Sequence, residues 1–206
     1  AAQLLAPVCR AIDFAHRNGV LHRDVKPSNI LIDQQQRPLV SDFGLAKQLK
    51  TRSGLTRTGA IVGTPNYIPP EQAAGNRGEL GPYSDVYSLG VVLYELLTGR
   101  RPFRGATNTE LLRQVISHAP RPPRMYDPTI PEQLERVCLK ALAKEPADRY
   151  ATAHDMAAAL QECCAAAAVR HLPAGRRRAA ALIVLAAIGA LLGGAAAFLS
   201  HRPQPT

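Results

Sequence analysis

Residues 22–29 read His22-Arg23-Asp24-Val25-Lys26-Pro27-Ser28-Asn29, and after a short apolar run residues 42–44 read Asp42-Phe43-Gly44. The two stretches bring together two aspartates, a lysine and an asparagine. Transfer of a phosphoryl group needs such side chains: a carboxylate that orients and deprotonates a hydroxyl, a cation for the γ-phosphate, and oxygen ligands for Mg²⁺. The pattern therefore predicts a phosphotransfer site.

A β-hairpin is predicted between the two stretches. Residues 30–32 (Ile-Leu-Ile) and 38–40 (Pro-Leu-Val) have the composition of short strands, and the polar residues 33–37 join them as a turn. Such a hairpin would return Asp42 to the side of Asn29. Both side chains could then reach one metal ion.

In these residues the chain resembles the eukaryotic-type (Hanks-type) serine/threonine protein kinases, in their bacterial style. The signature of that family is H-R-D-L-x-x-x-N followed by D-F-G, and Val25 replaces its Leu here. The resemblance implies that Asp24 is the catalytic base and that Lys26 steadies the transferred phosphate. It also implies that Asn29 and Asp42 hold Mg²⁺.

The same resemblance implies a nucleotide site and a set of supporting residues. ATP and Mg²⁺ are the expected cofactors. The residues implied to bind them are Lys26, Asn29, Leu31 and Asp42. The residues implied to support or regulate the loop are His22, Arg23, Phe43, Gly44, Thr64, Glu71, Asp85 and Arg149.

Length and charge exclude some other classes. The 206 residues suffice for one ordinary domain, and the net charge is +9. All 16 acidic residues fall within 1–165, beside 20 Lys and Arg, and the basic residues form no stripe interleaved with aromatics. Nucleic-acid binding is therefore disfavoured. The four cysteines show no metal or disulfide spacing, and we assign no role to the histidines at 16, 118, 154 and 171.

The pattern at the beginning of the chain predicts that only one lobe of a kinase domain is present. Apolar residues of 2–18 recur at helical spacing, and Asn18-Gly19 ends the pattern. In kinases a helix directly precedes the catalytic loop. The Gly-rich loop, the β3 lysine and its αC glutamate should lie before it, and none is found in the chain. We expect residues 1–165 to be the mainly helical C-terminal lobe of a kinase-like α+β fold, without the N-terminal lobe and inactive by itself.

The residues from Asp42 to Glu71 resemble the activation segment of the family. They are rich in hydroxyls and close on 63–71, Gly-Thr-Pro-Asn-Tyr-Ile-Pro-Pro-Glu, with proline in place of the alanine of the A-P-E motif. Thr64 is expected to contact the catalytic loop. Thr56 and Thr58 are candidate phosphorylation sites that Arg23 would bind. The alternative is that Arg23 only packs and the threonines are solvated.

Four helices are predicted downstream. Residues 84–98 are apolar on nearly every side, with Ser84 as the expected N-cap and Gly99 as the stop, so this helix is buried. Asp85 in its first turn would be a buried carboxylate, which needs hydrogen-bond donors. The resemblance implies that the backbone of the catalytic loop provides them. Helices are also expected over 109–118 and 131–143, and from 152, where Thr152 begins a capping box. The resemblance further pairs Arg149 with Glu71.

A membrane anchor is predicted at residues 179–199, which contain no charge and would span about 30 Å as a helix. Residues 166–178 form a basic linker, whose arginines at 176–178 would place the kinase portion in the cytoplasm, and residues 200–206 a short tail on the other side. Gly189 and Gly193 form a G-x-x-x-G that could support a homodimer. A plain anchor, or a soluble Ala-rich helix, is the alternative.

The sequence thus predicts a single-pass cell-membrane serine/threonine protein kinase that uses ATP to phosphorylate protein substrates. One alternative is a pseudokinase or scaffold that binds partners without catalysis. Another is a small-molecule phosphotransferase, which shares an H-x-D-x-x-x-x-N loop, although Lys26 and the segment 63–71 argue against it.

Overall fold

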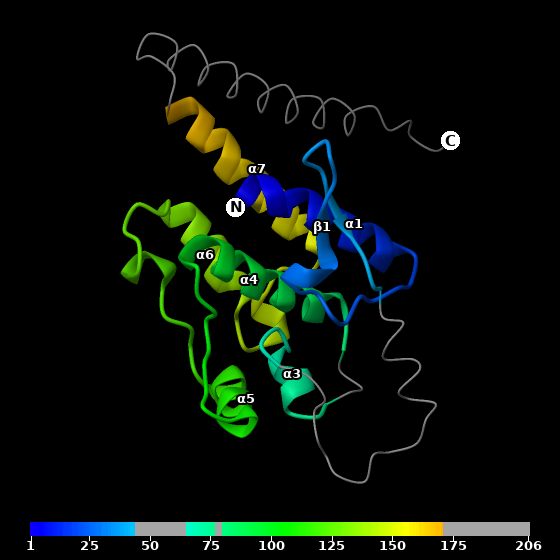
Figure 1. Ribbon diagram of the computed structural model, residues 1–206, viewed down its shortest axis with the longest axis vertical. Helices are drawn as coiled ribbons and strands as arrows, with labels where there is room; N and C mark the ends of the chain where they lie inside the picture. Colours follow the sequence, from blue (N-terminus) through cyan, green and yellow to red (C-terminus); the bar gives the residue numbers. More distant parts are fainter. Residues whose placement is uncertain (44–64, 77–79, 171–206) are drawn as a thin grey trace, which may run out of the picture. The chain divides into compact units, whose positions relative to one another are not determined.

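A computed structural model describes residues 1–43, 65–76 and 80–170 of the chain (Figure 1). The helices and strands follow in this order: α1 (Ala2–Arg17), η1 (Pro27–Asn29), β1 (Ile30–Ile32), β2 (Pro38–Val40), α3 (Pro70–Ala73), α4 (Pro82–Thr98), α5 (Asn108–Ser117), η3 (Pro123–Met125), α6 (Glu132–Ala141), η4 (Pro146–Asp148) and α7 (Ala153–Arg170). In this part of the chain the fold is mainly helical, with one two-stranded sheet.

Helix α4 is the centre of the core. Every residue from Ser84 to Tyr94 is buried, as the apolar pattern predicts, and the helix packs against α1 and α6. The approach to α6 is close, because a Cβ at Gly90 would lie 2.8 Å from the Ala141 Cβ. A side chain at position 90 would therefore separate the two helices.

Helix α1 and the hairpin lie beside this core. The buried stripe of α1 includes Leu5, Val8 and Ile12, and β2 packs against the same helix. Strands β1 and β2 pair antiparallel with Ile30 opposite Val40. The pairing continues beyond the strands, because the Ser41 amide donates to the Asn29 carbonyl at 3.0 Å.

Most of the predicted elements are confirmed, and their ends differ from the predicted ones by at most two residues. Both strands have the predicted bounds. The predicted capping box at the start of α7 is present, since the Asp155 amide donates to Thr152 Oγ1 and the Thr152 amide to Asp155 Oδ2. Gly99 ends α4 in the left-handed region, at φ 66°. The short α3 was not predicted.

The prediction of Ser84 as the N-cap of α4 is wrong. The helix starts at Pro82, with Gly81 as its N-cap, and Ser84 lies in the first turn. Proline suits the first helical position because it has no N–H to leave unpaired and its φ is already helical. Ser84 Oγ instead accepts a hydrogen bond from the Gly81 amide at 3.2 Å.

The predicted membrane anchor, 179–199, lies outside the described residues. In the described ranges, no helix combines the length and the apolar character that crossing a bilayer requires.

Candidate active site

The catalytic loop predicted at residues 22–29 is held in place by Asp85, in the first turn of α4. The amides of His22 and Arg23 donate to the two oxygens of this carboxylate, each at 2.8 Å. His16 Nε2 donates a third hydrogen bond at 2.7 Å. Asp85 is almost fully buried, and three donors replace the water that it loses. The predicted contact between Asp85 and the loop is therefore present.

His16 is a residue to which sequence reasoning gave no role. It lies four residues after Ile12 on the buried stripe of α1, and its side chain is 5% exposed. A polar residue four positions after a buried apolar residue of a helix lies on the same buried face and needs a hydrogen-bond partner there. This spacing could have predicted that His16 is buried with a polar partner, but not that the partner is Asp85, 69 residues further along the chain.

His22 links the loop to the hairpin. The side chain is fully buried, and its Nε2 lies 3.0 Å from the Ser41 carbonyl oxygen. Its Nδ1 accepts the Asp24 amide at 3.3 Å, so the tautomer with the proton on Nε2 satisfies both contacts. The Phe43 ring packs on His22, with 4.7 Å between ring centroids. One side chain thereby connects the two sequence stretches of the site.

The candidate catalytic groups project from this support toward solvent. Lys26 Nζ donates to Asp24 Oδ2 at 2.7 Å, and the two side chains are 36% and 48% exposed. Asn29 is buried, and its Nδ2 donates to the Asp24 carbonyl at 2.9 Å. An accessible carboxylate, an ammonium group and an amide are thus gathered within six residues of one loop.

The residues predicted to hold Mg²⁺ fit such an ion chemically. Because Asn29 Nδ2 is engaged with Asp24, Asn29 Oδ1 is the atom left for a cation. The exposed carboxylate of Asp42 follows the Ser41–Asn29 backbone bond, with Asp42 in the left-handed region at φ 60°. Carboxylate and amide oxygens are the ligands that Mg²⁺ prefers. Among the described residues, no larger cluster of His, Cys, Asp or Glu offers another metal site.

Other predicted site residues have these positions. Leu31 lies on β1 and is 52% exposed. Arg23 adopts φ 63°, in a region that costs a residue with a side chain about 1–2 kcal/mol. Gly44, Thr56, Thr58 and Thr64 lie outside the described residues.

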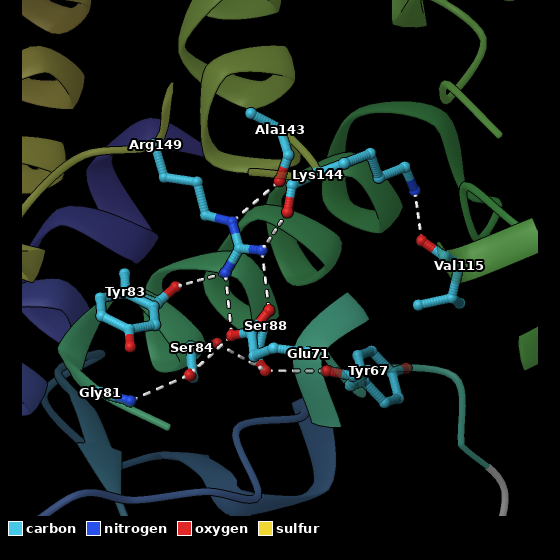
Figure 2. A network of polar contacts seen from close by, with 10 residues as sticks. All are labelled: Tyr67, Glu71, Gly81, Tyr83, Ser84, Ser88, Val115, Ala143, Lys144 and Arg149. Atoms are coloured by element: carbon cyan, nitrogen blue, oxygen red, sulfur yellow. Dashed lines mark hydrogen bonds and ion pairs between the residues drawn. The ribbon is translucent and has the colours of Figure 1, made fainter. Parts of the chain in front are cut away.

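A buried ion pair joins the last residue of the predicted activation segment to the residues before α7 (Figure 2). Arg149 Nη2 donates to Glu71 Oε2 at 2.8 Å and Arg149 Nη1 to Glu71 Oε1 at 3.0 Å. Their side chains are 0% and 4% exposed. The contact that the sequence predicted across 78 positions is therefore present, with bidentate geometry.

The surroundings of this ion pair satisfy its remaining polar atoms. The guanidinium also donates to the carbonyls of Ala143, Lys144 and Tyr83, at 2.8 to 3.1 Å. Ser84 Oγ donates to Glu71 Oε1 at 2.7 Å. Burial alone raises the pKa of Glu71, but the hydrogen bonds from Arg149 and Ser84 hold that pKa below its usual value. Glu71 is therefore held in its charged form.

Lys144 extends the network toward α5. Its Nζ donates to the Val115 carbonyl at 2.6 Å (Figure 2) and lies 4.1 Å from the centroid of the Phe103 ring. Burial, together with the charge of Arg149, lowers the pKa of Lys144 to about 8.

Tyr67 attaches the segment before α3 to α4, because its carbonyl accepts a hydrogen bond from Ser88 Oγ at 2.7 Å. Sequence reasoning identified none of these contacts.

Comparison with known proteins agrees with this arrangement. The family model described as "Protein kinase domain" matches residues 1–162. The chain belongs to the protein kinase family.

Two curated relatives with similar sequences are bacterial. The chain is 44% identical over 160 residues to serine/threonine-protein kinase PknB of Mycobacterium leprae, and 44% identical over 161 residues to PknB of Mycobacterium tuberculosis. Each match covers 78% of this chain and 25% of the relative. The chain thus spans about a quarter of the length of the curated relatives that it matches.

A solved structure is similar as well. The crystal structure of Rad53 1-466 in complex with AMP-PNP superposes with a TM-score of 0.61 and 29% sequence identity. The match covers 76% of this chain and 38% of that one. The fold is therefore kinase-like over most of the chain.

Proposed function

We propose that this chain is the catalytic C-terminal lobe of a serine/threonine protein kinase that transfers the γ-phosphate of ATP to hydroxyls of proteins. The observation that carries the proposal is the loop on which Asp24, Lys26 and Asn29 meet, anchored on buried Asp85. Relatives named serine/threonine-protein kinases, and a neighbour solved with AMP-PNP, support ATP as the donor.

In this mechanism Asp24 orients the hydroxyl of the acceptor and takes its proton. The oxygen of that hydroxyl forms the new bond to the γ-phosphorus, the bond to the β-phosphate oxygen breaks, and ADP leaves. Lys26, held 2.7 Å from Asp24, neutralises charge on the transferred group. Asn29 and Asp42 would hold Mg²⁺, which would supply positive charge to the phosphate oxygens.

The chain as given contains no Gly-rich loop and no β3 lysine to position the nucleotide. We therefore expect the 206-residue chain alone to transfer no phosphate at a useful rate. The test joins it to the part of PknB of Mycobacterium tuberculosis that precedes the matched region. This chimera, supplied with γ-labelled ATP, Mg²⁺ and a generic basic protein, should form phosphoserine or phosphothreonine, whereas the chain alone should not.

Two results would contradict this proposal. A folded chimera that binds ATP but labels no protein would favour a scaffold. Label that appears only on small hydroxyl compounds would favour a small-molecule phosphotransferase.

We also propose that the kinase is membrane-linked and switched on by phosphorylation. Residues 179–199 carry no charge, and the arginines at 176–178 favour a cytoplasmic position for the kinase lobe. Phosphate on Thr56 or Thr58 would offer the acceptor oxygens that an arginine such as Arg23 binds. The chimera carrying both Thr56→Ala and Thr58→Ala should lose activity, and wild-type activity in that variant would exclude the switch.

A further inference from the structure

A concave surface lies away from the catalytic loop, and arginines dominate it. It has a volume of about 450 Å³ and is formed by the residues that follow α4, by the second half of α5 and by the residues that follow α5. Its cationic lining is Arg100, Arg101, Arg104, Arg113 and Arg121, with His118 beside them. No aspartate or glutamate lines it. We call this surface the arginine groove.

The arginine groove is preformed by contacts that fix its walls. Gln114 on α5 holds the first wall, because its Nε2 donates to the Arg104 carbonyl at 2.7 Å and its Oε1 accepts the Arg104 amide at 3.4 Å. Tyr94 fixes the backbone at a second lining residue by donating to the Arg121 carbonyl at 2.9 Å. The Arg100 guanidinium stacks over the Tyr126 ring, 5.2 Å from its centroid. The backbone at Arg104 and Arg121 and the side chain of Arg100 are therefore held before a ligand binds.

The positive charge of the arginine groove is largely uncompensated. Arg101 Nε lies 3.8 Å from Glu95 Oε1, but the other oxygen of that carboxylate accepts Tyr67 Oη at 2.6 Å. Across residues 1–43, 65–76 and 80–170, none of the other four arginines is within ion-pair distance of a carboxylate. All five arginines are exposed. Five clustered like charges repel one another, and an anionic ligand would relieve that repulsion.

The chemistry of the arginine groove favours an anionic ligand. A guanidinium offers a planar pair of donors that matches a carboxylate or a phosphate, and a carboxylate is the anion that the side chains of an unmodified polypeptide carry. A hollow surface with the Tyr126 ring at its edge suits side chains that project from a polypeptide, whereas a lipid headgroup layer presents a flat face. We propose that the arginine groove docks an Asp/Glu-rich segment of the protein substrate. That the segment belongs to a protein substrate rests on the proposed function. That the segment is acidic rests on charge complementarity with the groove.

Binding can be measured without phosphate transfer. The 206-residue chain, kept in a non-ionic detergent, is titrated into a fluorescein-labelled peptide of alternating Asp and Glu, and anisotropy is recorded. The groove variant carries Arg104→Gln, Arg113→Gln and Arg121→Gln. The control variant carries Arg10→Gln, Arg136→Gln and Lys140→Gln, which remove the same charge from exposed positions outside the groove.

The groove variant should bind the acidic peptide at least about tenfold more weakly, because three arginine–carboxylate pairs are lost together. The control variant should bind it as the unaltered chain does. Equal binding by all three proteins, with unchanged circular dichroism, would overturn the proposal. So would a groove-dependent preference for a phosphoserine peptide, or for vesicles containing phosphatidylserine, over the acidic peptide.

A second measurement separates this proposal from the proposed function. In the chimera, a substrate fused to the acidic peptide should have a KM at least about fivefold lower than the unfused substrate, with kcat unchanged, because the groove is separate from the reacting groups. The groove variant should lose this difference. Peptide binding without any phosphate transfer would contradict the proposed function alone, whereas transfer without groove-dependent binding would contradict the docking proposal alone.

Discussion

Two ion pairs of nearly equal length serve this molecule in opposite ways. Lys26 and Asp24 lie 2.7 Å apart in the predicted catalytic loop, with side chains 36% and 48% exposed. Arg149 and Glu71 lie 2.8 Å apart in the core, with side chains 0% and 4% exposed. The distance between charged atoms is nearly the same, so the surroundings decide what each pair contributes.

The comparison shows which of the two ion pairs stabilises the fold. Water screens the exposed pair, so it adds little stability and its groups remain available to a substrate. The buried pair has lost its water, and the donors of Arg149 and both carboxylate oxygens of Glu71 are engaged by protein. Removing one buried partner should therefore destabilise the lobe strongly, while removing one exposed partner should affect only the chemistry.

The largest expected effect is that of breaking the buried pair. Arg149→Met leaves Glu71 charged and buried, which should lower the free energy of unfolding by about 3–5 kcal/mol. Urea unfolding of the 206-residue chain, followed by circular dichroism, measures it. The control is Arg136→Met, which breaks the exposed pair with Glu132 and should cost less than about 1 kcal/mol. Equal costs for the two variants would remove the distinction between the pairs.

The next effect concerns the anchor of the catalytic loop. Asp85→Asn should lower the free energy of unfolding by about 1–3 kcal/mol, because an amide side chain has one oxygen and either the His22 or the Arg23 backbone N–H loses its acceptor. Transfer by the chimera should fall as well, since the loop that carries Asp24 is no longer held. A variant with reduced stability but full activity would contradict the positioning role of Asp85.

A pH series tests the same buried pair. Because the pKa of Glu71 is lowered in the folded lobe from its usual value of 4.5, its contribution to stability is complete above that value and is lost as the pH falls through the folded pKa. The stability difference between the unaltered chain and Glu71→Gln should therefore shrink between pH 7 and pH 3. A difference that stays constant over this range would show that the charge of Glu71 contributes nothing.

The smallest effect on the free energy of unfolding is expected when the exposed pair is broken. Asp24→Asn removes an exposed charge that no part of the core depends on, so the free energy of unfolding should change by less than about 1 kcal/mol. Urea unfolding of this variant beside Arg149→Met gives the contrast directly. A cost comparable to that of Arg149→Met would mean that the catalytic loop is part of the folding core.

Local patterns predicted much of the fold. The hairpin, the buried helix around Leu89 and the helical stripe of α1 follow from spacing alone. The pairing of Arg149 with Glu71 was predicted only through the family resemblance, because nothing local connects residues 78 positions apart. Ser84 was misplaced as an N-cap because two competing starts, Pro82 and Ser84, lie within one turn.

Other features depend on packing that no local pattern records. His16 reaches Asp85, and Lys144 reaches the Val115 carbonyl, only after helices have assembled. The arginine groove likewise brings together residues 100–104, 113 and 121 from separate segments. The predictions for Thr56, Thr58, Thr64 and the anchor at 179–199 lie outside the described residues and remain predictions.

The most direct test of the account is the rate of phosphate transfer by the chimera carrying Asp24→Asn. As the proposed base, Asp24 should contribute roughly 10²–10⁴-fold, so kcat should fall by that factor while unfolding and ATP binding stay unchanged. The exposed aspartate Asp148, changed to Asn in the same chimera, should leave kcat as it was. A chimera whose kcat is the same with Asp24→Asn as without it would contradict the assignment of this loop as a phosphotransfer site.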